Sequence, residues 1–194
     1  MRLMDNIHPD KFVRGSVKVF DIGPDQDKQL IAEQENLYVY NGADIVAAAL
    51  ANRPGYHIAT MYMEFENLAA PGNPIIPPAY DRSSDVSYYS NLTSPRDFLR
   101  IPLTLQPTIA SSDETKFEGN QVTFFGISAG NVGVNGLGFI YTLNSTVFGG
   151  ALCASPVVDT QANDRILSRT YWADAAVLKQ QNHQIGVQWT LRFL

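Results

Sequence analysis

The chain has 194 residues, and its hydrophobic content of 45% is enough to build the core of a single globular domain. Only 17% of the residues are charged, against about 25% in an average soluble protein, and the formal net charge is −5. These values exclude a wholly disordered chain. They also exclude a basic nucleic-acid-binding surface, because the few Lys and Arg residues are scattered along the sequence.

The composition favours strands and turns over helices, because Gly and Pro, the poorest helix formers, occur 14 and 11 times. The longest apolar run, Ile45–Ala51, is far shorter than the roughly 20 residues that span a bilayer, so we expect no membrane partner. The N-terminus lacks the apolar segment of a secretory signal, and the single cysteine, Cys153, has no internal disulfide partner. We therefore expect synthesis in a reducing cytoplasm, with Cys153 as a small buried core residue.

Residues 1–35 mix charges with Gly and Pro and contain one strand-like run, Ser16–Phe20. A turn-like segment follows at residues 21–27. Because this region has too little apolar surface for a core of its own, we predict an extended N-terminal arm over residues 1–35. A single domain then occupies residues 36–194.

The clearest helix signal covers Gly42–Ala51, with Asn41 as its N-cap and Arg53-Pro54-Gly55 as its stop. We expect the helix to bury one apolar stripe, made of Ile45, Ala49 and Leu50. Beyond it, the hydrophobic period changes to two. Tyr56–Phe65 is a predicted strand with Ala59, Met61, Met63 and Phe65 on one face.

Residues 68–96 are rich in Pro, Ser, Asn and Tyr and predict a long loop, of the kind that often makes contacts. The strands expected after it are Phe98–Thr104, Gln121–Ser128, Leu137–Asn144, Ala151–Val158, Ile166–Trp172 and Gln184–Phe193. The last is the clearest, because Ile185, Val187, Trp189, Leu191 and Phe193 alternate with mostly polar residues. Seven or eight strands separated by turns predict a mainly β fold, a β-sandwich or jelly roll with one short helix.

One segment, Gly126-Ile127-Ser128-Ala129-Gly130, matches the G-x-S-x-G elbow of serine esterases. Asp159 or Asp164, followed by His183, would complete the chain order of a catalytic triad. The residues after the motif, 131–138, are rich in Gly and Asn, which favours a loop over the helix that an elbow needs. We therefore expect a strand–loop connection and no catalytic residues, and keep an esterase using Ser128 as an alternative.

The remaining polar residues indicate no metal site or cofactor, because the three histidines lack the spacing of metal ligands. Glu64 and Glu66 fit either a glycosidase pair or exposed strand positions. Aromatic side chains are stronger candidates, because tyrosine is enriched at interfaces. The interface candidates are Tyr80, Tyr88, Tyr89, Phe12 and Phe20. A carbohydrate-binding sandwich that stacks sugars on Tyr80, Tyr88, Tyr89 and Trp172 is an alternative.

The C-terminal half contains an ordered series of strand motifs. The series is Asn120-Gln121-Val122-Thr123-Phe124, then residues 133–139, then Arg169-Thr170-Tyr171-Trp172, and finally Gln184–Phe193. Together with residues 35–44 and 61–67, it resembles small structural proteins of tailed-bacteriophage virions, over roughly residues 35–194.

The resemblance implies a capsid cement (decoration) protein: a jelly-roll domain, usually a homotrimer, that binds across subunits of the major capsid protein on the outer surface of the virion. It implies no catalytic residue. A tail or baseplate component is the nearest alternative, because similar strand patterns occur in such proteins.

Overall fold

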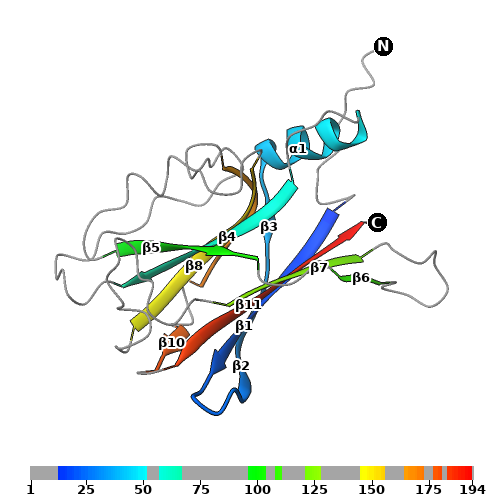
Figure 1. Ribbon diagram of the computed structural model, residues 1–194. Helices are drawn as coiled ribbons and strands as arrows, with labels where there is room; N and C mark the ends of the chain where they lie inside the picture. The colour runs from blue at the N-terminus through cyan, green and yellow to red at the C-terminus, as the bar shows by residue number, and fades with distance from the viewer. Residues whose placement is uncertain are drawn as a thin grey trace.

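The computed structural model describes residues 13–51, 57–66, 96–103, 108–110, 121–127, 145–155, 164–172, 177–180 and 183–193. These residues form eleven strands and one helix (Figure 1). The first half contains β1 (Val13–Ile22), β2 (Lys28–Glu35), β3 (Leu37–Tyr38), α1 (Tyr40–Leu50), β4 (His57–Glu66) and β5 (Arg96–Pro102). The second half contains β6 (Thr108–Ala110), β7 (Gln121–Ile127), β8 (Ser145–Ser155), β9 (Arg165–Tyr171), β10 (Val177–Lys179) and β11 (Gln184–Phe193).

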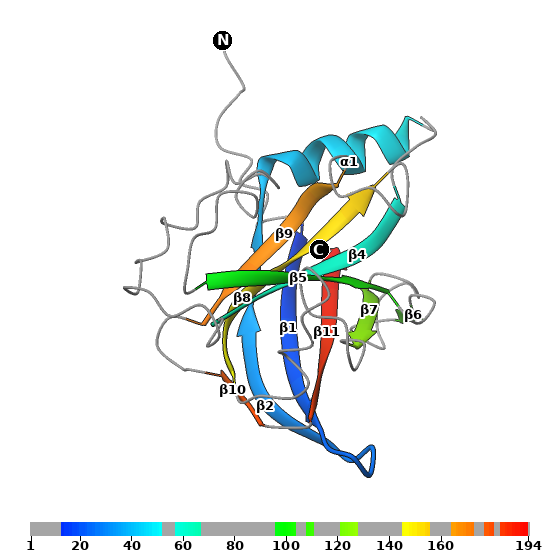
Figure 2. The same ribbon diagram turned by 60° about the vertical axis from the view of Figure 1, so that its left-hand side comes forward.

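The strands form two antiparallel sheets that cross one another in Figures 1 and 2. Sheet A has the order β2-β1-β11-β7-β6, and sheet B has the order β3-β9-β8-β4-β5, with β10 added beside β8. In sheet A, β1 pairs with β11 from Val13 opposite Phe193 to Ile22 opposite Gln184. The first and last described strands are therefore neighbours.

The main core lies between the two sheets. Sheet A contributes alternate residues of β1, β7 and β11, and sheet B contributes alternate residues of β4 and β8. The indole N–H of Trp189 in β11 donates a hydrogen bond of 2.8 Å to Ser168 Oγ in β9. Asn36 Nδ2 donates to the same oxygen at 2.5 Å. Both Trp189 and Ser168 are buried, so this polar contact fixes the two sheets relative to one another.

The prediction of a mainly β sandwich with one short helix is confirmed. The described residues contain more strands than the seven or eight expected, because β2, β3, β6 and β10 are polar or only two or three residues long. Gln184–Phe193 has the predicted bounds, and Met61, Met63 and Phe65 share the predicted core face. The predicted strand Leu137–Asn144 lies outside the described residues, and so does the predicted loop over residues 68–96 except for Arg96, which is the first residue of β5.

The predicted N-terminal arm over residues 1–35 is wrong for residues 13–35, which form β1 and β2 of sheet A. Val17 and Val19 are fully buried in the core. These two side chains are covered by apolar residues from distant segments, including β11. The composition of residues 1–35 alone therefore does not show that this region belongs to the core. Residues 1–12 lie outside the described residues.

The helix begins at Tyr40, two residues before the predicted start, and its N-cap is Val39, whose side chain makes no capping bond. Asn41 is therefore inside the first turn and is not the N-cap. Gly42 and Ile45 are buried, whereas Leu50 is 84% exposed, contrary to the predicted stripe. A Cβ on Gly42 would lie 2.5 Å from the carbonyl oxygen of Leu167, so close contact with β9 decides which face of α1 is buried.

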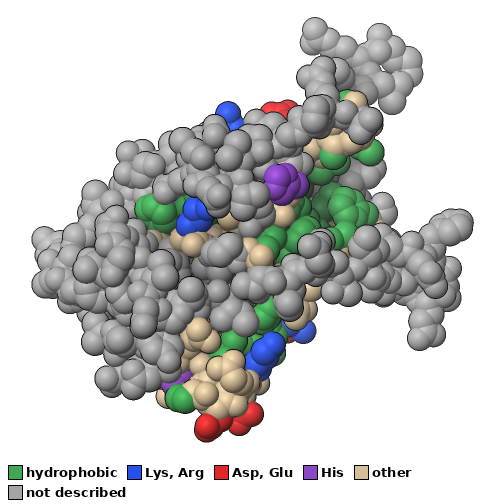
Figure 3. Space-filling view, in the orientation of Figure 1, with side chains coloured by type: hydrophobic (Ala, Val, Ile, Leu, Met, Phe, Trp, Pro, Cys, Tyr) green, Lys and Arg blue, Asp and Glu red, His purple; other side chains and the backbone are tan. Residues whose placement is uncertain are grey.

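The exposed residues of α1 are apolar except for Asp44. Figure 2 shows the helix lying across the ends of β9, β8 and β4. Its ends carry two exposed hydrophobic side chains, Tyr40 at 60% and Leu50 at 84%. In the space-filling view, hydrophobic side chains are exposed at this end of the molecule, and acidic side chains gather at the tip of the β1–β2 hairpin (Figure 3).

Candidate functional site

The outer face of sheet A carries Phe20, one of the predicted interface residues. Because Val17 and Val19 point into the core, the alternate residues of β1 point to the opposite face. Phe20 is opposite Leu30 of β2 and Gly186 of β11 in the strand register. The outer face of sheet A around Phe20 is therefore formed by β2, β1 and β11, and the opposite face of these strands packs in the core.

Four apolar side chains form a patch on this face, which we call the sheet A patch: Phe20, Ile22, Leu30 and Phe125. The rings of Phe20 and Phe125 are 6.3 Å apart between centroids and inclined at 58°. A Cβ on Gly186 would lie 2.9 Å from Ile22 Cδ1 and 3.2 Å from Phe125 Cζ. The glycine therefore provides the room that lets these side chains close over β11.

The sheet A patch is partly exposed and has a polar rim. Leu30 is 46% exposed, and both Phe rings are half-buried, whereas Ile22 is 1% exposed. The ammonium of Lys28 lies 4.5 Å from the centroid of Phe125, in a cation–π contact. An apolar centre with aromatic rings and a polar rim is the usual anatomy of a protein–protein interface.

The opposite end of the same face is polar. Thr123 and Thr190 face each other across β7 and β11, with their hydroxyl oxygens 3.2 Å apart. Arg14 is opposite Arg192 in the strand register. A shallow cavity of about 170 Å³ lies here, lined by Arg14, Gly15, Ser16, Glu35, Thr190 and Arg192. Sheet A thus offers an apolar contact area and hydrogen-bonding groups on one surface.

Sheet B carries ion pairs on the face turned away from the core. Arg100 Nε donates a hydrogen bond of 2.7 Å to Asp164 Oδ2, and its Nη2 donates to Oδ1 at 3.1 Å. The hydroxyl of Tyr62 donates to Asp164 Oδ2 as well. Burial raises the pKa of Tyr62, as does the bond to Asp164, so the hydroxyl keeps its proton. Hydrogen bonding to Asp164 raises the pKa of Arg100.

A second ion pair on this face joins β9 to β4. Arg169 Nη2 lies 3.2 Å from Glu64 Oε1, and both side chains are almost completely buried. The prediction that Glu64 occupies an exposed strand position is therefore wrong, and its carboxylate is paired with the guanidinium of Arg169. Pairs of this kind are costly to break, and they hold strands in register.

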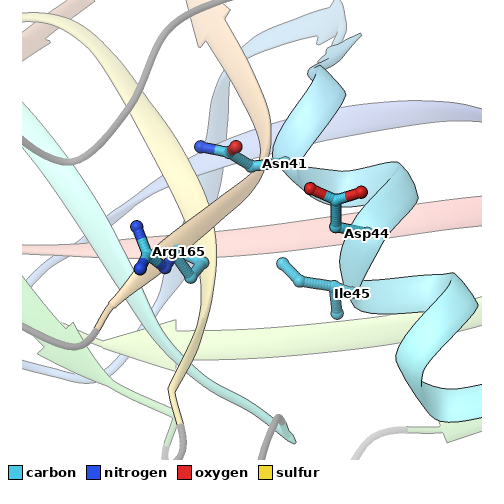
Figure 4. A pocket seen from close by; sticks show the side chains of 4 residues that line it. All are labelled: Asn41, Asp44, Ile45 and Arg165. Carbon is cyan, nitrogen blue, oxygen red and sulfur yellow. The ribbon is translucent and has the colours of Figure 1, made fainter.

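A larger pocket, of about 340 Å³, lies between α1 and β9 (Figure 4). Asn41, Asp44 and Ile45 line it from the helix, and Arg165 lines it from the start of β9. Asp44 and Arg165 are both exposed, so solvent screens their charges. The pocket has the character of a surface groove.

The structure does not bring the triad candidates Asp164 and His183 together. Asp164 is held by Arg100 and Tyr62, whereas His183 Nδ1 lies 2.7 Å from Asp21 Oδ2. Ser128 and Asp159 lie outside the described residues.

Several other candidates now have definite positions. Trp172 is only 4% exposed, so its ring is not available for the stacking on sugars that one alternative requires. Cys153 is fully buried, as predicted. The predicted interface residues Phe12, Tyr80, Tyr88 and Tyr89 lie outside the described residues. Sequence reasoning missed Phe125, Leu30 and Lys28, because only the register of β2, β1, β11 and β7 brings them beside Phe20.

The described part of the chain contains no group of three or more His, Cys, Asp or Glu side chains that could hold a metal ion. Within that part, no helix is long and apolar enough to cross a membrane. Comparison with known proteins finds no matching family model, no significantly similar curated protein and no significantly similar solved structure.

Proposed function

We propose that this chain is a structural protein of a tailed-bacteriophage virion, a cement protein that stabilises the capsid by binding across subunits of the major capsid protein. The motif series of the C-terminal half is the source of this assignment. Its described members lie on β7, β9 and β11, and Phe124 is directly opposite Trp189 in the core. The series therefore specifies a rigid sandwich, which suits a protein that acts by contact.

The observation that carries the proposal is the sheet A patch. Its aromatic rings are half-exposed on a sheet whose other face is fixed by the core, so little conformational entropy is lost when a partner covers them. The hydroxyl and guanidinium groups at the opposite end of this face supply polar groups on the same surface. A partner such as the major capsid protein would cover both ends of the face, at the outer surface of the virion.

Association with further copies, as a homotrimer, is part of the proposal. Light scattering on the purified chain measures this directly. A mass of three chains supports it, and a strict monomer at every concentration contradicts the trimer while leaving the capsid contact to be measured separately.

The capsid contact is tested with two matched substitutions of exposed leucines. Leu30→Ser alters the sheet A patch, and Leu50→Ser alters the far end of α1, where the leucine is still more exposed. Both proteins are added to capsids assembled without the chain, and bound protein is measured by cosedimentation. Loss of about 1.4 kcal/mol of apolar contact predicts roughly tenfold weaker binding for Leu30→Ser. Leu50→Ser should bind like the parent chain.

The outcomes separate the proposal from its alternatives. Equal binding by both variants removes the sheet A patch from the interface. Absence of binding to capsids, with binding to purified tails or baseplates, identifies the chain as a tail component and contradicts the cement function. Thermal unfolding of each variant verifies that the substitutions leave the fold intact.

A further inference from the structure

The strand β2 forms one edge of sheet A and is exposed along most of its length. Among the described strands it pairs only with β1, and the hairpin of these two strands projects at the bottom of Figures 1 and 2. Residues 28–30 and 33–35 are exposed, whereas Ile31 and Ala32 are half-buried against the core. The backbone groups on the side of β2 away from β1 therefore have no described strand to pair with, as at an open sheet edge.

The composition of β2 is not that of an edge protected against pairing. Natural edge strands avoid association by being very short, by containing Pro, or by carrying charges that repel a second strand. β2 has eight residues, no Pro, and an apolar centre, Leu30-Ile31-Ala32. Its first residue is Lys28, and the acidic Glu33 and Glu35 lie toward its other end. Opposite charges at the two ends of one strand attract a second, antiparallel copy of that strand.

A β-bulge decides which side chains of β2 share a face. Before the bulge, Lys28 and Leu30 are opposite outward-facing residues of β1. The register shifts at Ile31, the extra residue, and after the bulge Glu33 and Glu35 are opposite outward-facing residues of β1. The outer face of β2 is thus formed by even-numbered positions in its first half and by odd-numbered positions in its second half.

This change of parity lets β2 pair with itself with matching faces together. In an antiparallel register centred between Ile31 and Ala32, each Lys28 lies opposite Glu35 of a second copy, and each Leu30 lies opposite Glu33. On the other face, each Gln29 lies opposite Gln34. The apolar residues are then at the centre of the contact, with a charge pair of opposite sign at each end.

Other registers fit less well. Parallel pairing in register places Lys28 beside Lys28 and Glu35 beside Glu35, and like charges at facing positions are destabilising. An antiparallel register shifted by one residue places Lys28, on the outer face, opposite Gln34, on the inner face. A shift by two residues places Leu30 opposite Ile31 of the bulge and leaves Glu35 without a charge partner in the second copy.

The contacts that these charges make within one chain are compatible with the pairing. Glu33 lies 3.4 Å from Lys18 of β1, and both side chains are partly exposed, so Leu30 of a second copy can pack on their aliphatic stems. The ammonium of Lys28 lies over Phe125 on the outer face. The outer face is also where Glu35 of the second copy would lie, so Lys28 reaches it without turning to the other side of the sheet.

We propose that β2 is a self-association edge, at which two copies of the chain pair antiparallel about a two-fold axis between Ile31 and Ala32. The pairing joins the A sheets of both copies into one continuous sheet and brings the two sheet A patches together on one side of it. It does not depend on the proposed capsid function. A homotrimer formed through another surface would be joined to a second trimer by this contact.

Disulfide trapping between two single-cysteine variants tests the register. Gln29→Cys and Gln34→Cys place thiols at exposed positions, and the native Cys153 is fully buried. Chains of the two variants are mixed and oxidised in the native state, and the linked peptides are identified by mass spectrometry. The proposed register places these two positions opposite each other, with Cα atoms about 5 Å apart, which is within the range of a disulfide. In either variant alone the two thiols would be roughly 17 Å apart and could not join.

A second pair and a control complete the trapping experiment. Lys28→Cys mixed with Glu35→Cys tests the neighbouring position of the ladder, because facing pairs alternate between wider and closer spacing. Leu50→Cys, on α1, gives the rate of random collision for an exposed thiol. We expect at least one mixed sample to form dimers about tenfold faster than its separate variants and than Leu50→Cys, because pairing raises the effective concentration of the facing thiols.

The outcomes decide the proposal without capsids, so they are separate from the test of the capsid contact. Mixed samples that react no faster than their separate variants overturn it, and so does a main product that joins position 29 to position 29. Lys28→Glu, added to both Gln29→Cys and Gln34→Cys, should slow trapping by about tenfold, or about 1.4 kcal/mol over the two charge pairs. An unchanged rate in that variant contradicts the proposed register.

Discussion

The hydrogen bond between Trp189 and Ser168 offers a direct test of how the two sheets are held together. Ser168 is fully buried, and its hydroxyl accepts the indole N–H at 2.8 Å. Ser168→Ala removes the acceptor and leaves a buried N–H without a partner. The cost of such an orphaned donor is about 1–3 kcal/mol, and Asn36 loses its acceptor in the same variant. We expect the free energy of unfolding to fall by about 2–3 kcal/mol.

A double-mutant cycle isolates the contact from general packing. Trp189→Phe removes the donor and part of the ring, and its cost in the parent chain combines lost packing with a lost hydrogen bond. In the Ser168→Ala background, the same change also removes the orphaned N–H, so it should cost about 1–2 kcal/mol less. Urea unfolding of the four proteins gives the coupling energy. A coupling energy near zero would refute the view that this bond joins the sheets.

Three further predictions follow from buried positions. Burial lowers the pKa of Lys179 to about 8, so the unfolded chain binds more protons than the folded chain between about pH 8 and 10.5. This group therefore makes the free energy of unfolding rise with pH in that range, by at most about 3 kcal/mol. Lys179→Met should remove the rise, as measured by urea unfolding. Gly150→Ala should lower the free energy of unfolding by more than about 3 kcal/mol, because the added Cβ would lie 2.4 Å from the carbonyl oxygen of Tyr62. Gly23→Ala is the control, because the nearest atom to its added Cβ is 3.6 Å away. Equal melting temperatures for the two variants would contradict the close packing at Gly150. Cys153 should react with a thiol reagent only after unfolding, and rapid labelling of the native chain would contradict its burial.

The parts of the fold that could be predicted from sequence are strands in which core-facing and outward-facing residues alternate along a single segment. In β11, Val187 and Trp189 alternate with Gln188 and Thr190, and in β4 Met61 and Met63 flank Tyr62. Such alternation specifies a strand and its core face without knowledge of any partner. Both strands were therefore found with bounds correct to within one residue.

The remaining parts depend on contacts between distant segments. Residues 145–150 of β8 contain Gly149-Gly150, which favour a turn when read locally, yet Gly150 lies where only a glycine fits beside Tyr62. The polar strand β2 is recognisable only through its pairing with β1. The partners of Glu64 and His183 are more than 100 residues away, so neither buried pair could be predicted from spacing along the chain.

The sheet A patch illustrates the same limit at the candidate site. Phe20 was predicted as an interface residue from its type alone, whereas Phe125 and Leu30 join it through the register of four strands. A one-residue shift in any of these strands would move the side chain to the other face. Which residues form the patch is therefore decided by strand pairing, and the sequence alone predicted only that aromatic residues such as Phe20 would take part.

The most direct measurement of the proposed function is a cryo-electron microscopy reconstruction of capsids saturated with the purified chain. The proposal predicts added density on the outer surface where capsid subunits meet, with sheet A turned toward the shell and Phe20 and Phe125 covered. Density with sheet A facing solvent would contradict the assigned contact surface. A saturated preparation whose capsids show no added density would contradict the cement function itself.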